Sequence, residues 1–162
     1  MSKPKIRIYG AMPIEMRRHF REAIEYFARE LMSKQLAKNL NIQLRYKREL
    51  DSGALGQCDV LTDNTKPRHF RITICPKSDT RIGRQDIFKT LAHEMVHVKQ
   101  FAQRELKFRV RSLEKMTWKG KQVNESKVAY EKLPWEKEAF GKEEILFIDY
   151  VFYSESEDYF FG

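Results

Sequence analysis

The 162-residue chain has few cysteines and no long apolar run, and each shortage argues against a class of protein. A membrane-spanning helix needs roughly 18 to 20 consecutive apolar residues, and no run approaches that length, so we expect no membrane attachment. Residues 1–5 lack the apolar stretch of a signal peptide, which favours a cytoplasmic protein. Two cysteines, Cys58 and Cys75, are too few for a disulfide scaffold and lack C-x-x-C spacing. We interpret them as reduced, partly buried thiols; a disulfide between neighbouring strands is the alternative.

Charge is distributed unevenly along the chain. The net charge is +8, from 31 basic and 23 acidic residues. Residues 143–162 carry six acids and no base, so the first 142 residues hold 31 basic against 17 acidic side chains, a net charge of +14. A basic surface of this kind attracts nucleic acid or acidic partners, although an ordinary solvated surface balanced by an acidic tail has the same composition.

Apolar periodicity predicts a single α+β domain over residues 1–162, with an acidic, aromatic tail at about 150–162. Alternating residues predict strands at 6–9, 42–46, 58–62 and 69–75 and a hairpin turn within 118–123. Short connections favour a three- to four-stranded, mainly antiparallel sheet. Apolar residues at three- and four-residue steps predict a long helix from 13 to about 39–41, a second from 84 to 102 and a third from 134 to 148.

The second predicted helix contains the sequence His93-Glu94-Met95-Val96-His97, which reads H-E-x-x-H. Residues i and i+4 of a helix lie on one face, so both imidazoles can reach one metal ion. The helix buries a separate apolar stripe, which leaves the histidines on another face. Two imidazoles with Glu94 beside them are the parts of a zinc hydrolase, in which Glu94 is the general base. A surface cluster without metal is the alternative.

A catalytic zinc ion usually has three protein ligands and one water, so a third ligand is needed. The other two histidines, His19 and His69, precede the motif, and we interpret both as surface or structural residues. A third ligand downstream of His97 must therefore be a carboxylate. We favour Glu136, at the start of the third helix, over Glu138, which points about 200° away around that helix. The alternative role for either glutamate is to stabilise the helix dipole.

The order of a sheet, an H-E-x-x-H helix and a ligand-bearing helix resembles the zincin metallopeptidases. A glutamate as third ligand is the gluzincin variant, and the size and basic character resemble small SprT-like proteins, including metallopeptidases encoded by phages. The resemblance implies one Zn²⁺ held by His93, His97 and Glu136, a protein or peptide substrate, and the host cytoplasm if the chain is phage-encoded. SprT-like proteins commonly use a third histidine, which is missing here. Thermolysin-type gluzincins place an acid where this chain has Phe140, and the Glu136-x-x-Ala139 pattern is closer to the ImmA/IrrE type.

We therefore expect metal-assisted peptide hydrolysis. The metal lowers the pKa of its water, and Glu94 takes the proton and passes it to the leaving amine. Tyr130, just before the third helix, is a candidate donor to the oxyanion, with simple packing as its alternative role. The strand at 69–75 is a candidate to bind an extended peptide by strand addition.

The alternative hypothesis is a nucleic-acid-binding module with a structural or vestigial zinc site. It rests on basic residues that alternate with aromatic ones: Lys107, Arg109, Arg111, Lys119 and Lys121. A structural site is normally closed by a fourth protein ligand, and the sequence has no cysteine pair to supply one. The two hypotheses are compatible, since a protease can be recruited to nucleic acid. Oligomeric state is not readable from the sequence.

Overall fold

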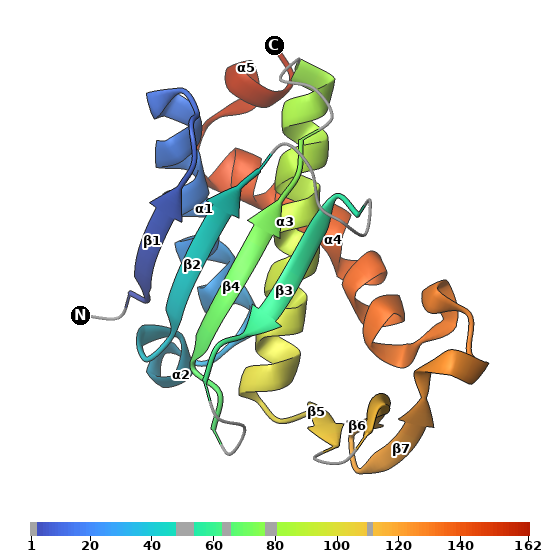
Figure 1. Ribbon diagram of the computed structural model, residues 1–162. Coiled ribbons are helices and arrows are strands. Elements are labelled where there is room, and N and C mark those ends of the chain that lie inside the picture. Colours follow the sequence, from blue (N-terminus) through green and yellow to red (C-terminus); the bar gives the residue numbers. More distant parts are fainter. Residues whose placement is uncertain (1–2, 48–53, 63–65, 77–80, 110–111) are drawn as a thin grey trace.

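The computed structural model describes residues 3–47, 54–62, 66–76, 81–109 and 112–162. The chain forms two sheets and a set of helices (Figure 1). In order the elements are β1 (Lys5–Tyr9), α1 (Ile14–Leu31), α2 (Lys34–Lys38), β2 (Asn41–Tyr46), β3 (Gly56–Val60), β4 (His69–Ile74), α3 (Arg81–Ala102), β5 (Leu106–Arg109), β6 (Ser112–Trp118), β7 (Lys121–Asn124), two 3-10 turns (Glu125–Lys127 and Tyr130–Lys132), α4 (Pro134–Tyr153) and α5 (Glu157–Phe160).

The predicted α+β class is confirmed, but the main sheet is not mainly antiparallel. Its strand order is β1-β2-β4-β3, in which β1, β2 and β4 are parallel and only β3 is antiparallel to its neighbour. The prediction assumed that strands joined by short connections pair with each other. Instead β3 takes the edge of the sheet and β4 inserts between β2 and β3, so β2 and β3 never pair. The small sheet β5-β6-β7 is antiparallel throughout.

The main sheet is covered on one face by α1 and α3, and α4 packs against α3 from the far side (Figure 1). The strands alternate accordingly: Ile6 and Ile8 of β1 are buried and their neighbours are exposed. The buried apolar side chains form one cluster, in which Phe20 stacks on Phe88 with ring centroids 4.8 Å apart. Two layers of helix on one sheet face therefore make α3 the central element of the domain.

Helix α3 is buried on every side along its second half, since all residues from 91 to 102 are buried. The apolar stripe faces the sheet and α1, as expected from its spacing. The face that carries His93 and His97 is covered as well, because α4 lies across it. The histidines are thus held inside the protein, and their polar atoms need partners there.

The long first helix of the sequence prediction is two helices. Helix α1 ends at Leu31, and Met32 adopts an extended conformation. The Ser33 hydroxyl then accepts a hydrogen bond from the backbone N–H of Leu36 at 3.1 Å and starts α2. None of the helices in the described part of the chain combines the length and the apolar character needed to cross a membrane.

The acidic, aromatic tail packs onto the body. Phe160 in α5 is completely buried, with ring contacts to Phe88 and Phe147, and Gln85 donates a hydrogen bond to the Phe160 carbonyl at 2.8 Å. Apolar side chains therefore fix a segment whose charge alone suggested a solvated tail.

Replacement of Phe160 by alanine should lower the free energy of unfolding by about 3 to 5 kcal/mol, because it leaves a cavity in the aromatic cluster. The neighbouring Phe161 is 42% exposed, so Phe161→Ala should change stability by about 0.5 kcal/mol or less. Urea unfolding followed by circular dichroism measures both variants. Equal losses in the two would show that α5 is not anchored as described.

Candidate metal centre

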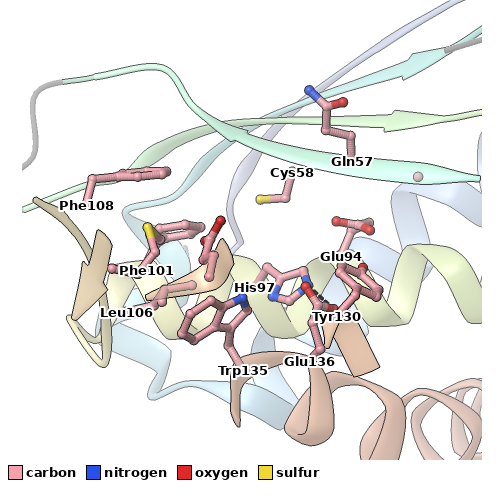
Figure 2. A pocket seen from close by; sticks show the side chains of 13 residues that line it. Gln57, Cys58, Glu94, His97, Phe101, Leu106, Phe108, Tyr130, Trp135 and Glu136 are labelled. Atoms are coloured by element: carbon pink, nitrogen blue, oxygen red, sulfur yellow. Dashed lines mark hydrogen bonds and ion pairs between the residues drawn. The ribbon is translucent and has the colours of Figure 1, made fainter. Parts of the chain in front are cut away.

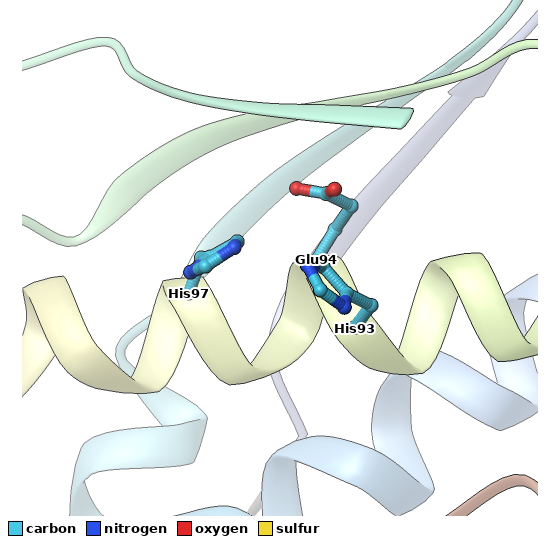
Figure 3. Close-up of side chains that lie close together, drawn as sticks. All are labelled: His93, Glu94 and His97. Atoms are coloured by element: carbon cyan, nitrogen blue, oxygen red, sulfur yellow. The ribbon is translucent and has the colours of Figure 1, made fainter. Parts of the chain in front are cut away.

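His93, Glu94 and His97 lie in the middle of α3 and are buried (Figure 3). Each offers one ligand atom, and these atoms lie within 4.8 Å of one another, so the group can hold a metal ion. Helix geometry alone places the two imidazoles on one face, one turn apart. The motif predicted from sequence is therefore a spatial cluster in the folded chain.

The carboxylate of Glu136 meets both imidazoles from the opposite helix. One oxygen, Oε1, lies 2.9 Å from Nε2 of His93 and 3.2 Å from Nε2 of His97. Glu136 is in the first turn of α4, where Pro134 occupies the helix start and Leu133 precedes it in an extended conformation. Glu136 is itself buried, with 5% of its surface exposed. The glutamate favoured by sequence is thus the one that converges on the histidines.

Glu138, the competing candidate, points to a different set of partners. Its carboxylate pairs with Lys99 at 2.8 Å and Lys142 at 2.9 Å and accepts a hydrogen bond from Gln100 at 2.8 Å. Two positions along a helix change direction by about 200°, which separates the two glutamates as expected. Glu138 belongs to a network beside the cluster and does not contact the histidines.

Both imidazoles are also engaged at their second nitrogen. Nδ1 of His97 lies 2.8 Å from Oε1 of Gln100, which is completely buried. The amide nitrogen of Gln100 donates to the carbonyl of Trp135 at 2.9 Å. Nδ1 of His93 lies 3.9 Å from a carboxylate oxygen of Glu143. Acceptors at Nδ1 of a neutral imidazole hold the proton there and would leave the Nε2 lone pair for a metal ion. Without a metal, both Nε2 atoms face the Glu136 carboxylate instead.

The charges of the cluster shift its pKa values. Burial lowers the pKa of His93, but the nearby carboxylates of Glu136 and Glu143 outweigh burial and raise it to about 9. Burial raises the pKa of Glu136, and the two imidazoles more than reverse this and hold it at about 2. The pKa of His97 is also raised, since the same carboxylate outweighs its burial. Without a metal, the site is therefore a cluster of protonated imidazoles around a carboxylate, and a metal cation could take the place of the protons.

The side chain of Glu94 points from α3 toward β3 (Figure 3). Burial raises the pKa of its carboxyl group, and the histidine charges only partly offset the effect. No described residue donates a hydrogen bond to this carboxylate. A β-carbon added at Gly56 of β3 would lie 3.3 Å from Oε1 of Glu94 and 2.5 Å from the Thr90 side chain. Glycine at this position therefore allows β3 to pass directly over Glu94.

A cavity of about 230 Å³ opens between β3, α3 and the start of α4 (Figure 2). Glu94, His97, Glu136 and Tyr130 line one end of it. Burial, together with the nearby Glu136 charge, raises the pKa of the Tyr130 hydroxyl. Tyr130 was a candidate from sequence, and the fold brings it to the site.

The strand next to this cavity is β3, not the one predicted to bind peptide. Strand β4 is paired on both sides, with β2 and β3, so residues 69–75 present no open edge. Strand β3 is the edge of the sheet in the described part of the chain, and its residues Gly56 to Cys58 line the cavity. The expectation of strand addition therefore moves from β4 to β3.

The remaining histidines and the cysteines lie outside the ligand cluster. His19 is buried, and its Nδ1 lies 2.7 Å from the Tyr150 hydroxyl, whereas His69 pairs with Gln43 at 3.2 Å. Both cysteines are free thiols. These structural roles agree with the interpretation from sequence.

The basic residues of the nucleic-acid hypothesis do not form one face among the described residues. Lys107 of β5 lies opposite Thr117, and Lys121 of β7 lies opposite Trp118, the next residue of β6, so the two lysines point to opposite faces of the small sheet. Lys119 is in the turn, 3.7 Å from Glu105. Arg111 and the side chain of Arg109 are outside the described part. Nucleic-acid binding remains a prediction.

Sequence reasoning missed three positions that shape the site: Gln100, Glu143 and Gly56. Gln100 had a detectable signal, since it lies three residues after His97 on the same helix face. Glu143 and Gly56 had no such signal in the sequence. The contact of Glu143 with His93 depends on how α4 crosses α3, and the role of Gly56 depends on how closely β3 approaches α3. No protein-family model, curated protein or solved structure matches this chain, so the description of the site rests on its own geometry.

The metal-free protein should lose stability as the pH rises above neutrality. The raised pKa of His93 contributes stability that is complete below pH 6.5 and is lost as the pH rises through about 9. The lowered pKa of Glu136 contributes stability that is complete above pH 4.5 and is lost as the pH falls through about 2. Urea unfolding of the chelator-treated protein between pH 6.5 and 9 measures the first effect.

The matched variants for this experiment are Glu136→Gln and Glu131→Gln. Glu136→Gln removes the charge that raises the His93 pKa, so the free energy of unfolding of this variant should fall less steeply with rising pH. Glu131 is exposed, so Glu131→Gln should retain the wild-type slope. The same slope in both variants would contradict the electrostatic description of the cluster.

Proposed function

We propose that this protein is a zinc-dependent peptide hydrolase whose zinc ligands are His93, His97 and Glu136 and whose general base is Glu94. The observation that carries the proposal is that one Glu136 oxygen lies 2.9 and 3.2 Å from the Nε2 atoms of the two histidines. Ligands at about 2.0 to 2.1 Å from a tetrahedral zinc ion are about 3.3 Å apart, close to these separations. The donor set therefore fits zinc.

The surroundings of the three donors support a metal ion rather than a simple ion pair. Zinc-binding histidines usually donate their other N–H to a carbonyl or carboxylate oxygen, and Gln100 supplies such an oxygen to His97. Three protein ligands leave one position for water or substrate, which is the pattern of a catalytic site. When bound, zinc supplies Lewis acidity and lowers the pKa of a coordinated water toward neutrality.

Glu94 has the properties of a general base in this arrangement. It is adjacent to His93, lines the cavity and accepts no hydrogen bond from a residue within the described ranges. Its raised pKa makes proton uptake at neutral pH easier than for an exposed glutamate. Glu94 can hold a proton on a carboxylate oxygen and deliver it to the leaving amine. Across the cavity, the Tyr130 hydroxyl can donate a hydrogen bond to the oxygen of the attacked carbonyl.

The peptide would be held by β3. This edge strand passes over Glu94 at Gly56, so an added strand would present its backbone carbonyls at the mouth of the cavity. Backbone pairing fixes an extended conformation and is tolerant of sequence. Hydrolysis of extended peptide segments is therefore the reaction that this geometry supports best.

Replacement of Glu94 by glutamine should retain zinc and lower hydrolysis of an unfolded, dye-quenched protein by at least about a hundredfold, because only the proton carrier is lost. His93→Ala should lose both zinc and hydrolysis. Metal content by mass spectrometry and the rate of dye release measure the two effects, with Glu131→Gln as the unaffected control. A fully active Glu94→Gln protein would exclude the proposed base.

The third ligand is tested by comparing Glu136→Gln with Glu138→Gln. Loss of the carboxylate that contacts both histidines should weaken zinc binding by about a hundredfold or more, because only two ligands remain. Loss of the Glu138 charge disturbs only the network around Gln100, for which about tenfold is expected. Competition with a fluorescent chelator gives both affinities. A larger loss in Glu138→Gln would reverse the assignment.

A further inference from the structure

The cavity that begins at Glu94 and His97 extends into an apolar compartment. Its far end is lined by Phe101 of α3, Leu106 and Phe108 of β5 and Trp135 of α4 (Figure 2). Met116 of β6 also lines the cavity and lies opposite Phe108. Trp135 directly precedes Glu136, so the apolar wall starts next to the carboxylate that meets the histidines. The polar and apolar ends are therefore parts of one space.

The register of the small sheet builds this compartment. Phe108 lies opposite Met116 across the β5–β6 pair, so their side chains share a face, and Leu106 shares it two residues earlier. Phe108 stacks on Phe101 with ring centroids 5.1 Å apart, which joins this face to α3. Phe108 is nevertheless 42% exposed, whereas Leu106 and Met116 are each 3% exposed. An aromatic ring thus stands at the rim of a compartment with a closed apolar floor.

We propose that this compartment is a specificity pocket for a large apolar side chain, aromatic or long aliphatic, of the substrate residue next to the attacked carbonyl. The proposal rests on the proposed hydrolase function and adds the class of peptide sequence that is recognised. The whole cavity, its polar and apolar ends together, has a volume of about 230 Å³, which exceeds the roughly 150 Å³ that accommodates benzene. A peptide paired along β3 alternates its side chains, and one side chain of each pair points down toward α3 and this compartment.

Glu125 is the residue that would favour a different occupant, a cationic side chain. Its carboxylate lines the same cavity, and burial, together with the charge of Glu136, raises its pKa. A cationic side chain would gain from this acid, but five of the side chains that line the cavity are apolar: Phe101, Leu106, Phe108, Met116 and Trp135. Burial of apolar surface therefore favours an uncharged occupant.

Hydroxamic acids test the pocket and the metal site independently. The hydroxamate group binds zinc, and the hydrocarbon arm attached to it reaches into the neighbouring space. Inhibition constants or calorimetric affinities are measured on the zinc-loaded protein for acetohydroxamic, phenylpropanohydroxamic and aminohexanohydroxamic acids. The phenyl arm should improve affinity about ten- to a hundredfold over acetohydroxamic acid, the gain expected for burying one aromatic ring. Phe108→Ser should remove most of this gain, whereas Phe152→Ser, which replaces a phenylalanine that is 58% exposed outside the cavity, should not.

A second arm of the experiment needs no metal. Phenylpropanamide, which lacks a zinc-binding group, should shift the methyl NMR signal of Met116 in the metal-free protein. If no hydroxamate binds but phenylpropanamide shifts this signal, the pocket stands and the proposed zinc hydrolase fails. The pocket proposal is wrong if acetohydroxamic acid binds, the phenyl arm gives no gain in affinity over it, and phenylpropanamide leaves the Met116 signal unchanged. Tighter binding of the aminohexano compound than of the phenyl compound would also overturn it.

Discussion

A single carboxylate oxygen, Oε1 of Glu136, is shared by two imidazoles that are buried in the centre of the domain. Buried ionisable groups are costly unless they are paired, so this contact constrains how α3 and α4 can pack. Gln100 reinforces the constraint because one side chain contacts His97 on α3 and the Trp135 carbonyl at the start of α4. Removal of either partner would leave uncompensated polar groups between the two helices.

The main sheet is positioned relative to the same group of residues on α3. Helix α3 carries Glu94 on the side that faces β3, and the glycine at position 56 lets the edge strand pass over that carboxylate where a β-carbon would collide with the Thr90 side chain. The small sheet then closes the other end, where Phe108 and Met116 face Phe101 and Trp135. Three groups of elements thus surround one cavity, with the acidic and imidazole groups at one end and an apolar floor at the other.

The sequence predicted the parts of the site that depend on local periodicity and on the scarcity of histidine. The i, i+4 spacing of His93 and His97 is a property of any helix. The lack of a later histidine left only a carboxylate as third ligand, and Glu136 at the start of α4 is the glutamate that contacts both histidines. Parallel pairing of β2 with β4 was not predictable, because strand order depends on contacts distant in sequence. For the same reason Gly56 and the Phe108–Met116 pair carried no recognisable signal. The basic residues near the hairpin were expected to act together, yet the register places Lys107 and Lys121 on opposite faces.

The proposed hydrolase requires an open zinc site whose protein ligands are two imidazoles and one carboxylate. X-ray absorption spectroscopy at the zinc edge of the stoichiometrically loaded protein tests it most directly, because zinc–sulfur bonds of about 2.3 Å are distinct from zinc–nitrogen and zinc–oxygen bonds of about 2.0 to 2.1 Å. With His93, His97 and Glu136 as ligands, we expect a shell of nitrogen and oxygen only, with the multiple scattering of two histidines. A sulfur ligand, which Cys58 in the same cavity would supply, would indicate a closed structural site and contradict the proposed hydrolase.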